Sequence, residues 1–485
     1  MGIGRVIGGV SGPGSGAPRQ LISPVDGGEI ATIDECNRQD VSAAITAAAA
    51  AYGPWSVFTP GERSRLLLRF ADVIEAHVDE LTELEVAETG KPIPVARDGE
   101  IPFAVDNLRF FAAAARSLEG SGAGTLSTGY TSMLVRRPLG VVAGIAPWNF
   151  PLVMAIWKLG PALAAGNSLV LKPAPTTPSS TLRLAELAIG AGLPAGVLNV
   201  VTGDADVAQQ LVADPRVSLV SITGSPEAGR AVMATAAEQT KRVHLELGGK
   251  APALVFADAD LPTTAAGLAM AATYNSGQDC TAATRVYVER EVSQEFTSLL
   301  AAALDRVRVG HPAADTTDIG PLISTEHRAR VHGFVERALA AGGHLVTGGR
   351  LPDGPGAFYP PTLITGARQD GELMQQEVFG PVVALLEFDD EDEAVALAND
   401  SAYGLASSVW SCDVARALRV AQRIEAGVTW VNDHLPIASE APHGGVKGSG
   451  FGKDLSQEAL ADYSVTQHIM LRHSAPPQHD SFRPA

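Results

Sequence analysis

The stretch Val141-Val-Ala-Gly-Ile145 opens the part of the chain that decides the fold, because apolar and helical segments alternate from there on. Three more short apolar segments follow, at residues 168–171, 198–201 and 219–222. Helical patterns lie between and after them, at residues 154–165, 181–189, 206–213 and 227–237. Strands that are apolar throughout and alternate with helices are typical of a parallel sheet with helices on both faces. We therefore predict an α/β fold with a doubly wound parallel sheet, whose ligands bind beyond the carboxyl ends of the strands.

A second unit with the same alternation extends from about residue 251 to residue 431. Its predicted strands are residues 253–256, 286–288, 406–409 and 428–431, and its predicted helices are residues 263–274, 293–307 and 326–341. Nearer the N-terminus, Asp40 is the expected N-cap of a helix over 41–51. An amphipathic helical pattern then runs from Pro60 to Val86.

Composition excludes several classes of protein. With 485 residues the chain has room for two or three domains, and a net charge of −18 argues against nucleic acid or an anionic membrane as partner. Cys36, Cys280 and Cys412 show no paired spacing, which fits a reducing compartment, and no Cys/His cluster has metal-ligand spacing. Residues 1–17 do not resemble a secretory signal, and no run of 18 apolar residues occurs. We expect a soluble cytoplasmic enzyme without a metal, with a disordered end from residue 474.

Cys280 is the candidate nucleophile. It lies in the polar, glycine-containing stretch Tyr274-Asn-Ser-Gly-Gln-Asp-Cys280, where a small molecule can reach the thiol. Upstream, Leu245-Glu-Leu-Gly-Gly-Lys250 places the carboxylate of Glu246 at the end of an apolar stretch. A nucleophile with a candidate base is the minimum for covalent catalysis. An inert buried thiol would be the alternative for an isolated cysteine.

Five blocks in order resemble the NAD(P)-dependent aldehyde dehydrogenase superfamily, and the resemblance covers nearly the whole chain. The blocks are residues 146–151 (Ala-Pro-Trp-Asn-Phe-Pro), 222–225 (Ile-Thr-Gly-Ser), 245–250, 277–280 (Gly-Gln-Asp-Cys) and 377–381 (Glu-Val-Phe-Gly-Pro). Within the superfamily the chain looks most like γ-aminobutyraldehyde (aminoaldehyde) dehydrogenases. The segments Trp430-Val-Asn-Asp-His434 and Pro442-His-Gly-Gly445 suggest this branch.

The resemblance implies roles for four catalytic residues. Cys280 would attack the aldehyde and form a thiohemiacetal and then a thioester, and Glu246 would activate the water that hydrolyses it. Asn149 would donate to the oxyanion, and Lys158 matches a family lysine beside that site, although a surface charge at a helix end is the alternative. Many members carry a second glutamate as a proton relay, where this chain has Gln457.

The resemblance also implies a dinucleotide site, although no Gly-x-Gly-x-x-Gly fingerprint occurs. Ser225 and Pro226 suit the start of a helix whose free amides attract a phosphate. Members that prefer NAD often carry glutamate where this chain has Pro175, so NAD is expected and NADP stays possible. The expected cofactor-binding residues are Trp148, Lys172, Gly224, Ser225, Gly229, Leu247, Gly248, Glu377 and Phe379.

The implied substrate pocket has aromatic and apolar walls with one acid beside the nucleophile. This suits a short aldehyde that ends in an ammonium group, such as 4-aminobutanal from polyamine catabolism. Betaine aldehyde or a broad range of aliphatic aldehydes is the alternative. Glu100 and Asp106 are further candidates for binding the amine, unless they form a solvated helix face. The expected substrate-binding residues are Phe150, Met154, Trp157, Asp279, Thr281, Ile437 and His443.

The family arrangement divides the chain into three parts. Residues 1–119 and 139–248 would form the dinucleotide-binding domain and residues 249–448 the catalytic domain, followed by a linking segment at 449–463. Residues 120–138 and 464–485 would form a small oligomerisation sheet, whose strand-like pieces are 125–137 and 467–472, in a homodimer or homotetramer. An inactive binding or structural homologue and a CoA-acylating enzyme are the rival hypotheses. The presence of Cys280, Glu246 and Asn149 argues against the first, and Glu246 against the second.

Overall fold

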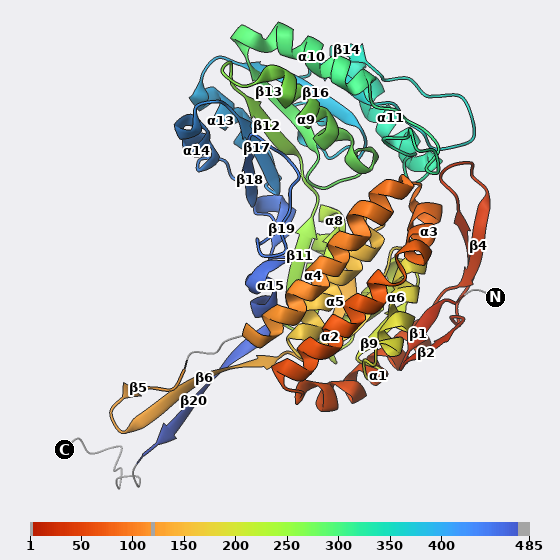
Figure 1. The fold of residues 1–485 in the computed structure, drawn as a ribbon, viewed down its shortest axis with the longest axis vertical. Helices are drawn as coiled ribbons and strands as arrows, with labels where there is room; N and C mark the ends of the chain where they lie inside the picture. Colours follow the sequence, from red (N-terminus) through yellow and green to blue (C-terminus); the bar gives the residue numbers. More distant parts are fainter. Residues whose placement is uncertain (1–2, 118–121, 474–485) are drawn as a thin grey trace.

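The computed structural model describes residues 3–117 and 122–473. Two large sheets, each covered by helices on both faces, form the two main lobes (Figure 1). The eight-stranded sheet has the order β19-β11-β10-β7-β8-β9-β1-β2, and the seven-stranded sheet has the order β14-β15-β16-β13-β12-β17-β18. The predicted doubly wound α/β fold is confirmed.

The centre of the eight-stranded sheet is parallel, and short antiparallel strands close both of its edges. The predicted strands at 141–145 and 198–201 have those bounds in the structure, because each is buried at every position. The strands are β1 (Arg5–Ile7), β2 (Val10–Gly12), β7 (Val141–Ile145), β8 (Ser168–Lys172), β9 (Leu198–Val201), β10 (Val217–Gly224), β11 (Arg242–Leu247) and β19 (Gly450–Phe451). The strands β1 and β2 were not predicted from the sequence.

Alternate residues of these strands supply two separate cores. Leu169 and Leu171 pack into one core, whereas Val170 between them packs into the other. The helices on the first side are α2 (Pro60–Glu75), α3 (Val78–Thr89), α4 (Ile101–Ala114), α5 (Pro151–Ala164), α6 (Ser179–Gly190) and α15 (Ser456–Asp462), with short helical turns at Val95–Glu100 and Ala115–Ser117. The helices on the second side are α1 (Arg38–Ser56), α7 (Ala205–Ala213) and α8 (Pro226–Ala237).

Two expectations for the N-terminal helices were wrong in detail. Asn37, not Asp40, is the N-cap of α1, and Asp40 is the third residue of a capping box with it. The pattern from Pro60 to Val86 forms two helices, α2 and α3, that meet near His77. Helical periodicity continues across such a break, because both helices pack an apolar face on the same core.

The seven-stranded sheet is built in the same way. Leu254 packs with α11, α13 and α14, whereas Ala253 and Val255 pack with α9 and α10 on the opposite face. The strands are β12 (Ala251–Val255), β13 (Ala283–Glu289), β14 (His344–Thr347), β15 (Thr362–Thr365), β16 (Val382–Phe388), β17 (Ala406–Trp410) and β18 (Val428–Val431). The helices are α9 (Leu261–Thr273), α10 (Ser293–Asp305), α11 (Thr325–Ala340), α12 (Glu372–Gln375), α13 (Glu391–Asn399) and α14 (Val414–Ala421), with short turns at Tyr274–Gly277, Arg290–Val292 and Lys447–Ser449.

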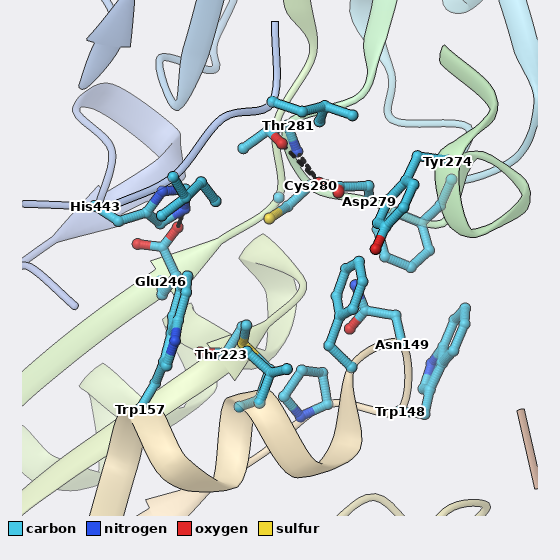
Figure 2. Close-up of a pocket in the computed structure, with 18 of the residues that line it drawn as sticks. Trp148, Asn149, Trp157, Thr223, Glu246, Tyr274, Asp279, Cys280, Thr281 and His443 are labelled. Atoms are coloured by element: carbon cyan, nitrogen blue, oxygen red, sulfur yellow. Dashed lines mark hydrogen bonds and ion pairs between the residues drawn. The ribbon is translucent and has the colours of Figure 1, made fainter. Parts of the chain in front are cut away.

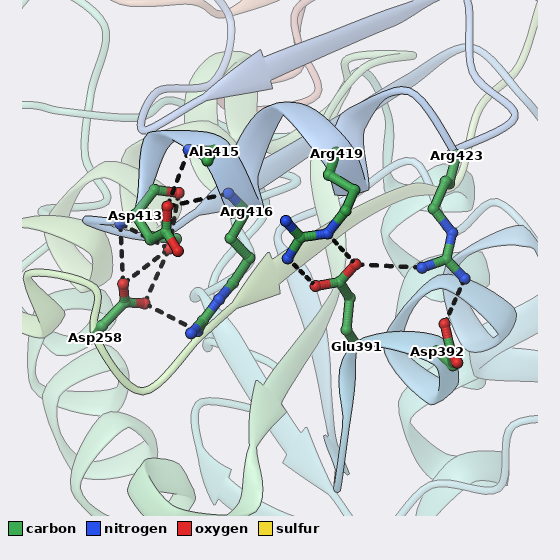
Figure 3. A network of polar contacts seen from close by, with 9 residues as sticks. Asp258, Glu391, Asp392, Asp413, Ala415, Arg416, Arg419 and Arg423 are labelled. Atoms are coloured by element: carbon green, nitrogen blue, oxygen red, sulfur yellow. Dashed lines mark hydrogen bonds and ion pairs between the residues drawn. The ribbon is translucent and has the colours of Figure 1, made fainter.

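Polar contacts anchor α14 to the outside of this lobe (Figure 3). Asp258 accepts hydrogen bonds from the Ser411 hydroxyl and the Asp413 backbone N–H, each at 2.9 Å, just before the helix begins. Farther along the helix, Arg419 and Arg423 bind Glu391 at 2.7 and 3.2 Å. The arginine pairs are exposed and contribute little, whereas Asp258 holds the start of the helix through backbone.

Two smaller sheets complete the chain. The strands β3 (Pro18–Ile22) and β4 (Glu29–Asp34) form a hairpin, and β5 (Gly124–Ser127), β6 (Tyr130–Pro138) and β20 (Ser464–Arg472) form a three-stranded sheet that projects from the body (Figure 1). The prediction for the end of the chain from residue 474 lies outside the described residues. No helix in residues 3–117 or 122–473 is long and apolar enough to cross a membrane.

Candidate active site

A cavity of about 860 Å³ lies where the strands β7, β10 and β11 end (Figure 2). Asn149 follows β7, Thr223 and Ser225 stand at the end of β10, and Glu246 is the penultimate residue of β11. Cys280 enters the cavity from the loop after α9. The carboxyl edge of the sheet is thus the ligand site that its topology predicts.

A strained turn brings Cys280 to the cavity. After α9 ends at Thr273, Asn275 and Ser276 have φ angles of 50° and 58°, in the left-handed region that side chains disfavour. Gly277 follows with φ of 72°, and a Cβ there would approach the Gly380 carbonyl carbon to 2.3 Å. Strain of this kind persists where surrounding packing over-determines the backbone. The turn therefore fixes the direction in which Cys280 faces.

The two glycines after Glu246 let this turn approach β11. A Cβ on Gly249 would lie 2.1 Å from the Cys280 carbonyl oxygen, and one on Gly248 would lie 2.3 Å from the Glu377 carboxylate. The Gly249 backbone N–H donates to that carboxylate at 3.0 Å. Both glycines are thus needed for close packing, and they place the base and the nucleophile in one cavity.

Cys280, Glu246 and His443 meet in the cavity. Their sulfur, carboxylate oxygen and ring nitrogen all lie within 4.8 Å of one another, and the distance from His443 Nε2 to Glu246 Oε1 is 3.5 Å. Figure 2 shows Glu246 and His443 facing each other beside the Cys280 sulfur. The spacing along the chain gave no sign of this group, because its members come from three distant segments.

Electrostatics keep the Cys280 thiol protonated. Burial raises the pKa of Cys280 well above its ordinary value, and the neighbouring carboxylates Asp279, Glu246 and Glu377 raise it further. Burial alone would lower the pKa of His443, but its interaction with Glu246 and the more distant Asp454 and Asp279 raises it on balance. The thiol therefore needs a base within reach, and Glu246 is the carboxylate placed there.

Asn149 lines the cavity beside the nucleophile. Its side-chain amide donates to the Gln278 carbonyl at 3.0 Å, and an amide has a second N–H available. Its backbone carbonyl accepts hydrogen bonds from the side chains of Lys91 and Asn275, at 3.1 and 2.8 Å. These contacts fix the amide in the cavity that Cys280 also lines, where a donor to an oxyanion is expected.

Lys158 does not belong to the cavity wall. It is completely buried, and its ammonium binds the Asp454 carboxylate at 2.9 and 3.3 Å. The alternative of a surface charge is wrong, because the helix α5 turns this side chain into the core. The hypothesis of a lysine beside the oxyanion stays a prediction. Asp454 in turn forms two backbone hydrogen bonds with His443, at 2.8 and 2.7 Å, so Lys158 supports the site indirectly.

The other predicted substrate-binding residues, Phe150, Met154, Trp157, Asp279, Thr281, Ile437 and His443, all line the cavity. Glu100 lines it too and is buried, so it does not belong to a solvated helix face. Glu100 forms an ion pair with Lys91, and burial raises the pKa of Glu100 to about 7. Asp106 is exposed and binds the Ser439 hydroxyl instead.

Most of the predicted cofactor-binding residues also line the cavity: Trp148, Gly224, Ser225, Leu247, Gly248, Glu377 and Phe379. Ser225 is the N-cap of α8, and a Cβ on Gly224 would meet no atom nearer than 3.8 Å, so a phosphate can approach the backbone there. Trp148 and Phe379 meet edge to face at 5.2 Å. These features fit a bound dinucleotide.

Two predicted cofactor contacts lie outside the cavity lining. Gly229 packs against Leu247, where a Cβ would approach the leucine to 2.6 Å, so it serves the packing of α8 on β11. Lys172 is buried and donates to the Pro173 carbonyl at 3.1 Å, and burial lowers its pKa to about 8. Sequence position alone does not show whether a glycine makes room for a ligand or for the close packing of a helix.

Sequence reasoning missed several cavity residues, among them His327 and Arg330 in the first turns of α11. His327 packs against Trp148, and its Nε2–H donates to the Phe379 carbonyl at 2.7 Å. Phe103 and Tyr274 were missed as well, because an aromatic residue in a helix is typical of an ordinary core. No local signal distinguishes these residues before the segments are brought together.

The site combines an accessible thiol, a buried carboxylate and an amide donor at the carboxyl edge of a doubly wound sheet. These features define a thiol-dependent α/β enzyme. The aldehyde dehydrogenase family model matches residues 13–469. The chain belongs to the aldehyde dehydrogenase family.

Several individual proteins are similar to this chain over nearly its whole length. The chain is 40% identical to the betaine aldehyde dehydrogenase of Cereibacter sphaeroides over 94% of both chains, and 39% identical to that of Bacillus subtilis over 93% of both. The solved structure of the Staphylococcus aureus betaine aldehyde dehydrogenase with NAD+ has a TM-score of 0.96 and 35% identity, and covers 100% of this chain and 97% of that one. An indole-3-acetaldehyde dehydrogenase of P. syringae has a TM-score of 0.95 and 38% identity, with 97% of each chain covered.

Proposed function

We propose that the protein oxidises an aldehyde that carries a cationic nitrogen, with NAD as the electron acceptor, and that betaine aldehyde is the first candidate. The charge of the cavity carries this proposal. Among its described lining residues are six acids and a single arginine, Arg330. Glu100 and Glu227 are paired with Lys91 and Arg230, which leaves the carboxylates of Glu246, Asp279, Glu377 and Asp433. Such a lining attracts a positively charged substrate.

The aromatic walls fit a quaternary ammonium group. Phe150 and Tyr274 stack at 6.3 Å with an angle of 18° between their rings, and Phe103 meets Trp157 edge to face at 6.4 Å. A trimethylammonium group has no N–H to donate, so aromatic faces and nearby carboxylates are the groups that recognise it. The names of the relatives support this candidate.

An ω-aminoaldehyde such as 4-aminobutanal is the second candidate, and Glu100 favours it. Its Oε1 is buried and accepts no hydrogen bond from the described part of the chain. A primary ammonium could donate to this oxygen, whereas a trimethylammonium group could not. Asp279 Oδ1 already accepts from the Thr281 backbone and hydroxyl, each at 2.7 Å, which leaves its second oxygen for a substrate.

The chain's own residues supply each step around the sulfur. Glu246 takes the thiol proton, the sulfur attacks the aldehyde carbon, and Asn149 donates to the oxygen as it becomes negative. When bound, NAD supplies the acceptor for the hydride that leaves this carbon. Glu246 passes the thiol proton on to solvent, and it then takes a proton from the water that hydrolyses the resulting thioester on Cys280.

Neutral isosteres of the candidate substrates test the proposal. Betaine aldehyde is compared with 3,3-dimethylbutanal, and 4-aminobutanal with pentanal, with succinate semialdehyde as the anionic control. We expect kcat/KM to favour each cation over its isostere by about ten- to a hundredfold, and succinate semialdehyde to be poorest. Equal kcat/KM for the cations and their isosteres would overturn it.

Two variants separate the candidates. Glu100→Gln should lower kcat/KM for 4-aminobutanal more than for betaine aldehyde, because only the primary amine can donate to Glu100. Asp279→Asn should lower kcat/KM for both cations relative to their isosteres, because it removes a charge beside the sulfur. If Glu100→Gln affects both cations and both isosteres equally, Glu100 does not read the amine.

A further inference from the structure

A sulfur, a carboxylate and an imidazole nitrogen converge in the cavity from three distant segments. They belong to Cys280, Glu246 and His443, and no two of these ligand atoms are more than 4.8 Å apart. Thiolate, carboxylate and imidazole are the three side-chain ligands that zinc takes in proteins. We propose that these residues bind a zinc ion, which holds the nucleophile in an unreactive form.

The distances fit a tetrahedral ion. Ligands at ordinary zinc distances lie about 3.3 Å apart for nitrogen and oxygen, and about 3.6 Å apart when one of them is sulfur. The His443 Nε2 to Glu246 Oε1 distance is 3.5 Å. Two ligands are therefore already spaced for zinc, and the sulfur reaches its position with a shift of about 1 Å.

The carboxylate is free to bind an ion. Both oxygens of Glu246 are buried, and neither accepts a hydrogen bond from the described residues. Glu246 is held on β11, which pairs with β10 on one side and β19 on the other. A buried carboxylate on a rigid strand is costly unless a cation or a proton donor meets it; His443 lies 3.5 Å away, and zinc would bind both groups.

His443 is held as firmly as Glu246. Its backbone forms two hydrogen bonds with Asp454, and its ring packs on Trp157 at 5.1 Å. Contacts of this kind, which a histidine makes with residues other than the metal, orient it for metal binding. Cys280 is the ligand that adjusts, through its side chain, because the strained turn fixes its backbone.

Binding balances charge without any redox step. The thiol loses its proton to solvent as the Zn–S bond forms, and thiolate and carboxylate together neutralise the two positive charges of the ion. A tetrahedral ion with three protein ligands would take water in its fourth position. A sulfur bound to zinc shares its lone pair with the ion and attacks an aldehyde more slowly, so the ion would inhibit the enzyme reversibly.

Metal binding can be measured directly on the chelator-treated full-length protein, without an aldehyde. Titration with Zn2+ against a chromogenic chelator should give one ion per chain. Co2+ should give a sulfur-to-metal charge-transfer band and the intense visible bands of a tetrahedral site. Bound zinc should also protect Cys280 from alkylation by iodoacetamide, and EDTA should restore alkylation.

The variants give the decisive comparison. His443→Phe should weaken Zn2+ binding by more than about tenfold, since even the loss of an outer-shell partner costs about 10- to 100-fold. Glu246→Gln should do the same, and Cys280→Ser should remove the Co2+ charge-transfer band. Cys412→Ser, which changes an exposed thiol outside the cavity, should bind Zn2+ like the parent. Unchanged affinity in both His443→Phe and Glu246→Gln, or loss of binding in Cys412→Ser, would overturn the proposal. These results do not depend on which aldehyde is the substrate.

Discussion

The Cys280 thiol is protonated, and therefore a weak nucleophile, until a base removes its proton. Burial raises the pKa of this thiol, and the carboxylates of Asp279, Glu246 and Glu377 raise it further, so the free enzyme holds a thiol and not a thiolate. Asp279 is the nearest of these acids in sequence. Protonation protects the nucleophile from side reactions but makes the enzyme depend on Glu246.

Cys280→Ala should abolish aldehyde oxidation and leave NAD binding intact. The change removes the atom that forms the thiohemiacetal but leaves the cofactor end of the cavity as it is. Steady-state NADH production and NAD binding by fluorescence are the measurements. The controls are Cys36→Ala and Cys412→Ala, which lie outside the cavity and should retain activity. Turnover above a few per cent in Cys280→Ala would contradict covalent catalysis at this residue.

Glu246→Gln should slow the release of the acid more than the transfer of hydride. With no carboxylate to activate water, the thioester accumulates on Cys280. Rapid mixing should show a burst of about one NADH per active site, slower than in the parent because the thiol also loses its base, followed by a still slower steady rate. An unchanged steady-state rate would mean that another group activates the water.

At the scale of elements, buried carboxyl groups join α3 to its neighbours. Glu88 accepts hydrogen bonds from the Ser179 backbone and hydroxyl at the start of α6, and Glu85 accepts from the Leu152 backbone at 3.1 Å. Burial raises the pKa of Glu88 to about 8. This carboxyl is therefore protonated in the folded protein at neutral pH.

The position of Glu88 makes stability depend on pH. A raised pKa in the folded state contributes stability that is complete below the ordinary value of 4.5 and is lost as pH rises through about 8. The Tm of Glu88→Gln relative to that of the parent should therefore rise by a few degrees as the pH is raised from about 5.5 to about 8.5, because glutamine never ionises. Glu75→Gln, an exposed change on α2, is the control. If the curves of Tm against pH are parallel for the parent and Glu88→Gln, Glu88 does not have this role.

At the scale of the whole molecule, the projecting sheet is unlike the rest. Its order is β20-β6-β5, so β20 is an edge strand with unpaired backbone groups on one side. Val465, Ile469, Met470 and Leu471 on β20 are exposed apolar residues. An exposed apolar edge is a liability in a monomer, and a second copy of the chain would cover it.

We expect a homodimer or homotetramer that assembles through β20. The double variant Ile469→Lys with Leu471→Lys places two charges on one face of the strand and should shift the protein toward a monomer. Val10→Lys changes an exposed residue on another edge strand, β2, and should not. Light scattering distinguishes the states, and a parent protein that runs as a 50.2 kDa monomer would contradict the prediction.

Several strands and the family could be predicted from the sequence. Residues 141–145, 198–201 and 428–431 form strands with the predicted bounds, because hydrophobic periodicity depends on neighbours a few residues away. The blocks around Asn149, Glu246 and Cys280 were sufficient for the family, since their order is a property of the chain. Their side chains line one cavity, as the family arrangement implied.

Only the tertiary structure decided which side chains meet. His443 lies against Glu246, Lys158 is turned away into a pair with Asp454, and Glu100 is buried in the cavity wall. These outcomes depend on how distant strands and helices pack, and burial then sets which charges are neutralised and which protons are held. Local sequence patterns cannot predict those contacts, because the residues that touch in the folded protein lie far apart along the chain.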